Sequence, residues 1–554
     1  LILLFLAACA PEAPAPAAKP PVILISIDTL RSDRLPMYGY ERIETPHLDA
    51  FRKDAVLFER AYAHAPLTLP SHASLMTGLL PPQHGVRNNI GYTLSGKPTL
   101  ASVLRDNDYA TGAAVSSYVL RRTTGIGEGF DFYDDAILQR GGDAVGGIQR
   151  RGSETVAKAL TWLDTPRDKP PFLFLHLFEP HTPYEPTYDA EIEATDTIVG
   201  ALLQHLKDTK RYDHSLIVIL SDHGEGLGDH GEDEHGIFLY RESIQVPLVV
   251  KLPRQERAGE SVAHAVQLID VMPTILSAIG VNAPVTLAGR SLLEDQGART
   301  VFSETWYPRI HLGWSDLQSV IEGDRHFIEA PRPELYDLER DPAEKTNLAE
   351  EDRRALFALR EVAKRHRGTF AAPQTIDPEE AAKLAALGYL SGAGSTTGPR
   401  LNPRDHIAVL AKVQRTFVLN QEKRYRESAD LCREILREYP DLVDVYNQLA
   451  GNLRRLGRSE EALVAYKEAI RRSPQLVDSM AIEVAKLELD LGRLDAAQLN
   501  AQQALKLNPA EARLILAGVA MARKEWIAAE RDARLALDDE SRPRIPALIL
   551  LARI

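Results

Sequence analysis

Residues 22–28 read VILISID, a run of β-branched and aliphatic residues that ends in a carboxylate. Such a short, continuous apolar run is typical of a strand buried on both faces of a parallel sheet, with the next polar residue at the carboxyl edge. The same pattern recurs at residues 171–177 (PFLFLHL) and 215–220 (SLIVIL). The polar residues that follow the three runs are Asp28, Glu179, His181, Asp222 and His223. We therefore predict an α/β domain whose functional site lies along one edge of its sheet.

The length and composition of the chain limit its architecture and its partners. With 554 residues it is long enough for more than one domain. Charged residues make up 26% and hydrophobic residues 44% of the chain, as in soluble globular proteins. The formal net charge of -13 argues against a nucleic acid as partner, because binding to phosphate backbones requires clustered Lys and Arg side chains.

The first residues predict export and a lipid anchor. The apolar run at residues 1–8 is shorter than the roughly 20 residues that cross a bilayer, but it has the composition of a signal-peptide core. It lacks an initiating Met, so we expect the sequence to be clipped at this end. Residues 6–9 (LAAC) resemble a bacterial lipobox, in which Cys9 is lipidated and becomes the first mature residue. The alternative is an ordinary signal peptide with an incidental Cys.

Residues 10–21 are rich in Pro and Ala and predict an extended tether between the anchor and the α/β domain. Ala10 is not the residue linked in bacteria to retention in the inner membrane. The resemblance therefore implies attachment to the outer membrane, facing the periplasm. The other cysteine, Cys432, lies in an apolar helical pattern, so we expect a small buried side chain and no disulfide framework.

The C-terminal part predicts a helical repeat array. Residues 371–403 are rich in Pro, Gly, Ser and Thr and predict a linker between the α/β domain at 22–370 and the array at 404–554. The prolines that end the repeats lie 34, 35 and 34 residues apart, at Pro440, Pro474, Pro509 and Pro543. This period resembles the tetratricopeptide repeat, whose helix pairs bury their apolar faces against each other. An ordinary helical bundle explains the spacing less well. By analogy we expect a protein or peptide partner on the concave face, and because the chain stops within an apolar run, a truncated array.

Six segments carry the residues on which the functional prediction rests, and the last of them is structural rather than catalytic. They are IDTLRSDRLPMYGY (27–40), PLTLPSHASLMTG (66–78), HGVRNN (84–89), FLFLHLFEPHTPY (172–184), SDHGEGLGDHG (221–231) and ELYDLERDPAEKTNLA (334–349). In this order and at these separations they resemble the sulfatase branch of the alkaline phosphatase superfamily. The resemblance covers about residues 22–390. It implies a central sheet flanked by helices and a metal-dependent hydrolase that acts on anionic esters.

Three of the polar residues at the strand ends suit a divalent cation. Asp28, Asp222 and His223 offer hard or borderline ligands, and the resemblance assigns the same three positions to the metal. We also expect that metal to coordinate Thr68. The alternatives are that Asp28 caps the following helix and that Asp222 only turns the chain.

Thr68 separates two kinds of ester chemistry. Sulfatases carry a Cys or Ser here, in Cys/Ser-x-Pro-x-Arg, and oxidise it to formylglycine, whereas this chain reads Thr68-Leu69-Pro70-Ser71-His72. A Thr cannot become that aldehyde, so it lacks the second hydroxyl that expels sulfate. A Thr phosphate does not need that hydroxyl, because water can attack phosphorus in a second in-line step. The resemblance to superfamily members with a Thr nucleophile therefore predicts Thr68 as nucleophile and favours a phosphoester over a sulfate. Alternatively, the Thr68 hydroxyl caps a helix.

Groups that could neutralise the negative charge of the substrate are scarce. Many sulfatases have Gly-Lys-Trp-His after the strand that we predict at 111–115, but this chain continues with Ser116-Ser117-Tyr118. The remaining candidates are His181, His235 and Asn89, with Arg87 as a weaker one.

The resemblance leaves the number of metal ions open between one and two. Members with a Thr nucleophile often hold a second ion, and Glu179, His181 and His235 occupy comparable places. The alternative is that both histidines act as acids or hydrogen-bonding groups beside a single ion. We expect His230 to be structural. Carboxylate ligands favour Mg, Ca or Mn, and added His favours Zn.

The expected reaction is attack by the Thr68 alkoxide on phosphorus or sulfur, with His181 or His235 protonating the leaving alkoxide and Asn89 binding a nonbridging oxygen. Two other functions stay open. One is transfer of a phospho-substituent to a lipid or glycan, which the anchor suits although the usual transmembrane bundle is missing. The other is a catalytically idle scaffold whose repeats bind a partner.

Overall fold

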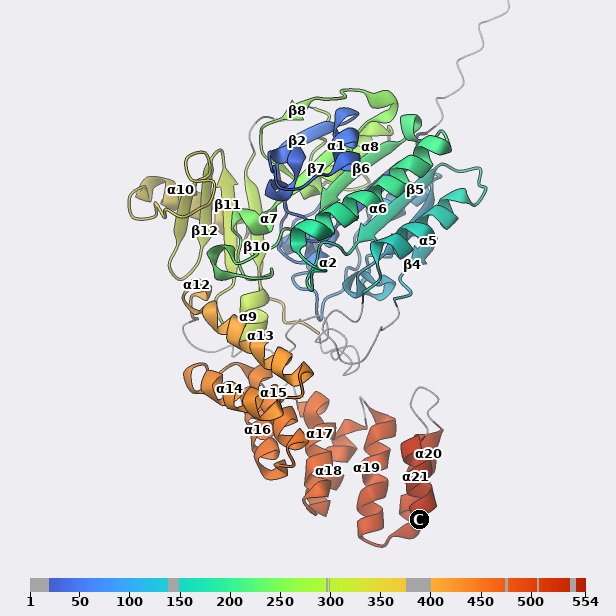
Figure 1. Ribbon diagram of the computed structural model, residues 1–554, viewed down its shortest axis with the longest axis vertical. Helices are drawn as coiled ribbons and strands as arrows, with labels where there is room; N and C mark the ends of the chain where they lie inside the picture. The colour runs from blue at the N-terminus through green and yellow to red at the C-terminus, as the bar shows by residue number, and fades with distance from the viewer. Residues whose placement is uncertain are drawn as a thin grey trace, which may run out of the picture.

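The computed structural model describes residues 19–137, 149–294, 297, 299–374, 400–473, 477–505, 508–538 and 545–554. The predicted lipobox with Cys9, most of the predicted linker, Pro474 and Pro543 lie outside these residues. Along the described chain, a large sheet with its helices comes first, a smaller sheet second and an array of helices last (Figure 1).

The large sheet is mixed and contains the three predicted strands. In the described residues it has nine strands in the order β4-β3-β5-β1-β6-β7-β2-β8, with β9 beside β2. The five strands from β4 to β6 are parallel, and β7 is antiparallel to both β6 and β2. The strands are β1 (Val22–Ile27), β2 (Val56–Tyr62), β3 (Ala110–Val115), β4 (Phe132–Asp134), β5 (Pro171–Leu177), β6 (Leu216–Ser221), β7 (Gln245–Lys251), β8 (Ser261–Val262) and β9 (Val266–Gln267).

Helices cover both faces of this sheet, which explains why its central strands are apolar throughout. Along β1, Val22 and Leu24 point into one buried cluster, whereas Ile23 and Ile25 point into another. The first cluster is closed by α2 (Thr68–Thr77), α4 (Leu100–Asp106) and α8 (Val271–Ala278). The second is closed by α1 (Pro46–Lys53), α5 (Gly152–Asp164) and α6 (Tyr188–Asp208) (Figure 1).

The carboxyl ends of the three central strands meet at one edge of the sheet. β1 and β5 have the predicted bounds, and β6 starts one residue later than predicted. Because β1 pairs in parallel with both β5 and β6, Ile27 lies opposite Leu177 on one side and Ser221 on the other. The polar residues that follow these strands are therefore brought together, and the predicted α/β class is confirmed.

The smaller sheet is antiparallel and consists of β10 (Val301–Thr305), β11 (Leu317–Glu322), β12 (Arg325–Glu329) and β13 (Glu334–Asp337). Helix α10 (Arg353–His366) packs on it through Leu356 and Leu359, in one cluster with Phe302 and Phe327. The segment at 334–349 supplies β13 and the turn after it, where the Asn347 side chain accepts the Leu335 N–H at 3.0 Å. This segment is therefore structural.

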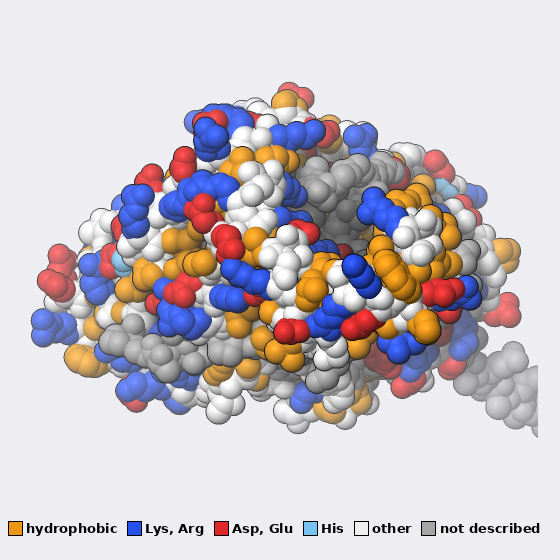
Figure 2. Space-filling view, turned by 90° about the horizontal axis from the view of Figure 1, so that it is seen from below, with side chains coloured by type: hydrophobic (Ala, Val, Ile, Leu, Met, Phe, Trp, Pro, Cys, Tyr) orange, Lys and Arg blue, Asp and Glu red, His pale blue; other side chains and the backbone are white. Residues whose placement is uncertain are grey.

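The C-terminal array consists of paired helices stacked side by side (Figure 1). Gly457 and Gly492 adopt left-handed φ values of 73° and 72° where one helix of a pair ends and the next begins. On the face seen from the array end of the molecule, basic and acidic side chains are intermixed (Figure 2). Among the described helices, none has the length and apolar character to cross a bilayer. The helices are α12 (Pro403–His406), α13 (Ala408–Gln421), α14 (Tyr425–Glu438), α15 (Val443–Arg455), α16 (Ser459–Arg472), α17 (Val477–Asp490), α18 (Leu494–Ala504), α19 (Pro509–Ala522), α20 (Trp526–Leu537) and α21 (Ile545–Arg553).

The start of the array contacts the smaller sheet and the segment that precedes β11. Val409, Val413 and Cys432 belong to the same buried cluster as Trp314 and Tyr336. Cys432 is fully buried and free, as predicted.

Polar contacts reinforce this docking. The Arg404 guanidinium donates to the Glu334 carboxylate at 2.5 Å and to the Tyr336 hydroxyl at 2.9 Å. The Ser315 N–H donates to the Leu401 carbonyl at 2.9 Å. The start of the array thus shares both a core and hydrogen bonds with the preceding domain.

Candidate active site

Two carboxylates without protein donors meet at the edge of the large sheet. Asp28 follows β1, Asp222 follows β6, and both are fully buried. None of their four carboxylate oxygens has a hydrogen-bond partner among the described residues. Burial and the charge of Asp28 raise the pKa of Asp222 well above its ordinary value. For Asp28, burial is outweighed by the neighbouring imidazoles, His176 foremost, which hold its pKa well below the usual range.

His223 directs an unprotonated nitrogen at these carboxylates. Its Nδ1 lies 2.9 Å from the Gly224 carbonyl oxygen, so Nδ1 carries the proton and Nε2 presents a lone pair. Nε2 lies 3.5 Å from an oxygen of Asp28 and 3.4 Å from an oxygen of Asp222. A lone pair and two carboxylates that face each other in a buried space repel unless a cation lies among them.

The donor set fits a divalent cation. One ligand atom from each of Asp28, Asp222 and His223 lies within 4.8 Å of the others. Two carboxylates and one neutral imidazole suit Mg, Mn, Ca or Zn. The orphaned oxygens and the orientation of the His223 ring are the observations that support this fit.

Thr68 stands beside this group at the start of α2. Its Oγ1 lies 3.4 Å from His223 Nε2, and the residue is fully buried. The N-cap of α2 is Leu67, and no side chain of the helix start makes a capping hydrogen bond. The alternative that the Thr68 hydroxyl caps the helix is therefore not what the structure shows. The hydroxyl instead faces the candidate metal ligands from the positive end of a helix dipole.

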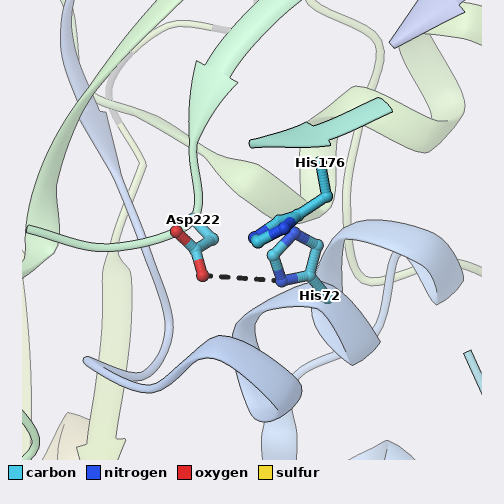
Figure 3. A group of neighbouring side chains, drawn as sticks. All are labelled: His72, His176 and Asp222. Atoms are coloured by element: carbon cyan, nitrogen blue, oxygen red, sulfur yellow. Dashed lines mark ion pairs between the residues drawn. The ribbon is translucent and has the colours of Figure 1, made fainter. Parts of the chain in front are cut away.

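His72 and His176 lie side by side next to Asp222 (Figure 3). His72 is one turn after Thr68 on α2. Its Nδ1 lies 2.8 Å from the Thr68 carbonyl oxygen and 3.5 Å from an Asp222 oxygen, and its Nε2 lies 2.9 Å from the Ser26 hydroxyl. Through these contacts His72 connects the Thr68 backbone with Ser26 of β1 and lies close to Asp222 at the end of β6.

His176 is a site residue that the sequence analysis did not single out. It is fully buried in β5, its Nε2 lies 3.4 Å from an Asp28 oxygen, and neither ring nitrogen has a hydrogen-bond partner among the described residues. Its ligand atom groups with those of His72 and Asp222 within 4.8 Å. The available signal was a single polar residue in the otherwise apolar run PFLFLHL.

His181 and His235 form a second imidazole pair beside His223. The ring centroids of His181 and His235 are 5.2 Å apart, and that of His235 is 4.4 Å from that of His223. His235 Nδ1 lies 2.9 Å from the carboxylate of Glu225, which is fully buried and also accepts the Tyr184 hydroxyl. Burial alone lowers the pKa of His235, but the charge of and hydrogen bond to Glu225 outweigh it and raise the pKa to about 9. Burial lowers the pKa of His181.

Glu179 does not contact this pair. Both of its carboxylate oxygens accept the Gly152 N–H at the start of α5, at 2.9 and 3.1 Å. The carboxylate that touches His235 is Glu225, three residues after Asp222, and the sequence analysis did not assign it a role. A second ion held by Glu179, His181 and His235 stays a prediction.

Of the candidates for binding the substrate anion, Asn89 has a free donor in place. Its Oδ1 accepts the Leu69 N–H at 2.8 Å, which fixes the amide, and its buried Nδ2 has no partner among the described residues. Arg87 is engaged elsewhere, because its guanidinium pairs with Glu304 at 2.5 Å and lies over the Trp306 ring.

His230 lies apart from these groups. Its two nitrogens contact the Glu242 carboxylate and the Glu344 carbonyl, at 2.6 and 3.1 Å, and its ring stacks on Tyr240.

Fold and site together define a metal-dependent hydrolase of the alkaline phosphatase type, and comparison with known proteins makes the assignment specific. Residues 20–281 match the sulfatase family model, and residues 228–365 match that of the N-sulphoglucosamine sulphohydrolase C-terminal region. Residues 443–476 match the tetratricopeptide repeat. The α/β part of this chain therefore belongs to the sulfatase family, whose members are hydrolases that act on ester bonds, and the predicted repeat type is confirmed.

Relatives and solved structures come from both sulfate and phosphorus chemistry. An arylsulfatase of Clostridium perfringens is 24% identical over 457 residues, which cover 62% of this chain and 93% of the relative. The multifunctional alkaline phosphatase superfamily protein PehA of Trinickia caryophylli is 35% identical over 188 residues, covering 29% of this chain and 36% of the relative. The phosphonate monoester hydrolase of Agrobacterium radiobacter has the same fold, with a TM-score of 0.54 at 21% identity over 63% of this chain and 95% of that structure.

Proposed function

We propose that this chain hydrolyses phosphoesters in preference to sulfate esters, with Thr68 as the nucleophile. The observation that carries the proposal is the Thr68 hydroxyl, buried and 3.4 Å from His223 at the candidate metal ligands. The residue at position 68 is a Thr, and neither of the two cysteines of the chain, Cys9 and Cys432, lies in the segment 66–78 where sulfatases carry the residue that becomes formylglycine.

Each residue of the site has a distinct task in this reaction. Asp28, Asp222 and His223 would hold a divalent cation, which would supply positive charge that favours the Thr68 alkoxide and the anionic substrate. Thr68 Oγ1 gives up its proton to solvent and attacks phosphorus, so that the Thr68–phosphorus bond forms as the bond to the leaving oxygen breaks. Asn89 Nδ2 donates to a nonbridging oxygen of the phosphoryl group.

Protonation of the leaving oxygen falls to the imidazole pair. Glu225 fixes His235 through Nδ1, so that His235 Nε2 is the nitrogen left to donate a proton to the leaving alkoxide, with His181 as its neighbour. Water then gives a proton to the neutral His235 and attacks phosphorus in line, and the Thr68–phosphorus bond breaks as the Thr68 oxygen takes up a proton from solvent. The intermediate is a phosphothreonine.

A rate comparison tests the substrate class. An aryl phosphate monoester, an aryl phosphodiester and an aryl sulfate with the same phenol are offered to the metal-loaded protein. We expect the higher kcat/KM on a phosphoester. A higher value on the sulfate would show that a Thr supports sulfatase turnover and would refute the preference.

A pair of variants tests the nucleophile. Thr68→Ala is expected to abolish turnover with an unchanged metal content, whereas Thr68→Ser keeps a hydroxyl and retains measurable turnover. Trapping and mass measurement of a phosphorylated residue 68 would identify the intermediate. Full activity of Thr68→Ala would remove Thr68 from the mechanism.

The surroundings of this reaction are also part of the proposal. The lipobox at residues 6–9 supports attachment through Cys9 to the outer membrane, facing the periplasm. The tetratricopeptide match supports binding of a protein or peptide by the array. Labelling with a lipid precursor, in the natural protein and in Cys9→Ser, tests the anchor, and labelling that survives the substitution would rule it out.

A further inference from the structure

A cavity lies between the candidate active site and the first long helix of the array. Its volume is about 370 Å³, within the range of roughly 300–1,000 Å³ that is usual for small-molecule sites. Pro183, His235 and the acidic residues 232–234 line it on the side of the sulfatase-family domain, and Leu410, Val413 and Phe417 of α13 line it on the opposite side. We call it the α13 cavity.

The wall formed by α13 is apolar. Leu410, Val413 and Phe417 are three and four residues apart, so they share one face of the helix. Except for Gln414, the residues of α13 that line the cavity are apolar. Leu410 and Phe417 are only half-buried, whereas Val409 and Val413 of the same helix are buried. An apolar ligand that covers Leu410 and Phe417 would remove further apolar surface from water.

The helix is fixed in this place by contacts at its start. Arg404 bonds Glu334 and Tyr336, and Val409 and Val413 are buried in a cluster that continues into the smaller sheet. The cavity wall is therefore set by the fold of both parts of the chain.

His235 lies both in the wall of the α13 cavity and next to the candidate metal ligand His223. This residue lines the cavity, and its ring centroid is 4.4 Å from that of His223, which in turn touches Thr68. In an in-line displacement the leaving oxygen lies opposite the attacking Thr68 hydroxyl and next to the residue that protonates it. If His235 is that residue, the carbon skeleton attached to the leaving oxygen extends past His235.

We infer that the α13 cavity receives an apolar alcohol portion of the ester, aryl or alkyl, so that the repeat array supplies part of the substrate site. This inference rests on the proposed hydrolysis. It gives the first long helix of the array a role in choosing the substrate, separate from any partner bound elsewhere on the repeats.

Two phosphate monoesters separate the apolar contact from leaving-group reactivity. Phenyl phosphate and 4-butylphenyl phosphate release phenols of similar acidity and differ in the alkyl chain. We expect the natural protein to show a kcat/KM at least about tenfold higher for the butylphenyl ester, since one buried methylene already discriminates by about tenfold or more. Leu410→Asp is expected to remove this preference, with the larger fall in kcat/KM on the butylphenyl ester.

Leu499→Asp is the matched control. Leu499 lies in α18 and is 67% exposed, so the same change of side chain there should leave the preference intact. Phe417→Ala is the second cavity variant if Leu410→Asp does not fold, and it should also reduce the preference. Equal rates on the two esters in the natural protein, or the same loss in Leu410→Asp and Leu499→Asp, would overturn the inference.

A binding measurement keeps this inference distinct from the proposed reaction. In the Thr68→Ala background, calorimetric titration should give tighter binding of the butylphenyl ester than of the phenyl ester, and Leu410→Asp should abolish the difference. If the natural protein hydrolyses neither ester but this difference in binding is present, the proposed activity fails and the apolar subsite stands. If both esters are hydrolysed without any difference in rate or binding, the subsite fails and the activity stands.

Discussion

Removal of the cation should destabilise the protein, and one substitution should reverse part of that loss. Asp28 and Asp222 are fully buried, and their ligand oxygens lie within 4.8 Å of each other. At that separation two unit charges repel by about 3.5 kcal/mol with an effective dielectric constant of about 20. Asp222→Asn keeps the shape of the side chain and removes one of the two charges.

The repulsion converts into a shift of the melting temperature. Unfolding entropy of about 2.1 cal/mol/K per residue gives about 0.7 kcal/mol/K for a domain of about 350 residues, so 3.5 kcal/mol corresponds to about 5 °C. A cation at about 1,000 times its Kd adds about 4 kcal/mol, or about 6 °C. In chelator we therefore expect the natural protein to melt about 6 °C lower than with metal, and Asp222→Asn to melt up to about 5 °C higher than the chelated natural protein.

The pH dependence of the chelated protein has a definite sign. The pKa of Asp222 is raised in the folded state by burial and by Asp28. Folding therefore takes up a proton as the pH falls through that raised value, and the cost of removing the metal shrinks. Scanning calorimetry at several pH values, with metal or with chelator, measures both effects.

Asp196→Asn is the control for a buried carboxylate that already has donors. Asp196 accepts the Leu48 N–H at 2.7 Å and the His47 N–H at 3.2 Å. This variant should lose the same stability with metal and with chelator. The reasoning would be refuted if the melting temperature of the natural protein were the same with and without chelator. It would also be refuted if Asp222→Asn were no more stable than the natural protein in chelator.

Three further predictions follow from contacts of the site and of the docked array. Asn89→Ala removes the free amide donor and should lower kcat by about 10² to 10³ with metal content unchanged, in steady-state kinetics on the preferred ester. His176→Phe should weaken metal binding by at least about tenfold in calorimetric titration, because its Nε2 lies 3.4 Å from Asp28. Arg404→Ala removes a donor to the buried Glu334 and should lower the free energy of unfolding by about 1–2 kcal/mol in urea, after screening at the partly exposed guanidinium.

For each of these variants, one outcome would contradict the prediction. Unchanged kcat in Asn89→Ala would mean that the amide does not touch the reacting group. Unchanged affinity in His176→Phe would leave the three ligands at the strand ends as sufficient. For Arg404 the control is Lys412→Ala, which removes an exposed, solvent-screened ion pair with Glu434 and should leave the free energy of unfolding nearly unchanged. Equal losses in both variants would deny Arg404 a role in docking.

Much of the fold and some of the site could be predicted because they depend on short, local sequence patterns. A strand covered on both faces must be apolar at every position, so the runs that became β1, β5 and β6 were visible without knowledge of their neighbours. Parallel pairing then forces the residues after those strands to one edge, which is why Asp28, Asp222 and His223 meet there. The repeat period was equally visible, because each repeat buries its apolar face in the same way.

Other features depend on which side chains meet across the folded chain, and a local pattern does not encode that. Glu179 stays a predicted ligand of a second ion, and the sequence did not show that its carboxylate accepts the Gly152 N–H at the start of α5 or that Glu225 contacts His235. His176 became a neighbour of Asp28 through the register between two strands far apart in sequence.

The α13 cavity is the clearest case. The apolar face of α13 predicts only that the helix packs on something, and any apolar surface of suitable shape would satisfy it. By itself, the sequence determined the two kinds of domain, the three candidate metal ligands at the strand ends and the candidate nucleophile. Only the tertiary structure decided that the first long helix of the array faces His235 across a cavity. The physical reason is that apolar burial is non-directional, so the partner of an apolar face is chosen by the packing of the whole chain.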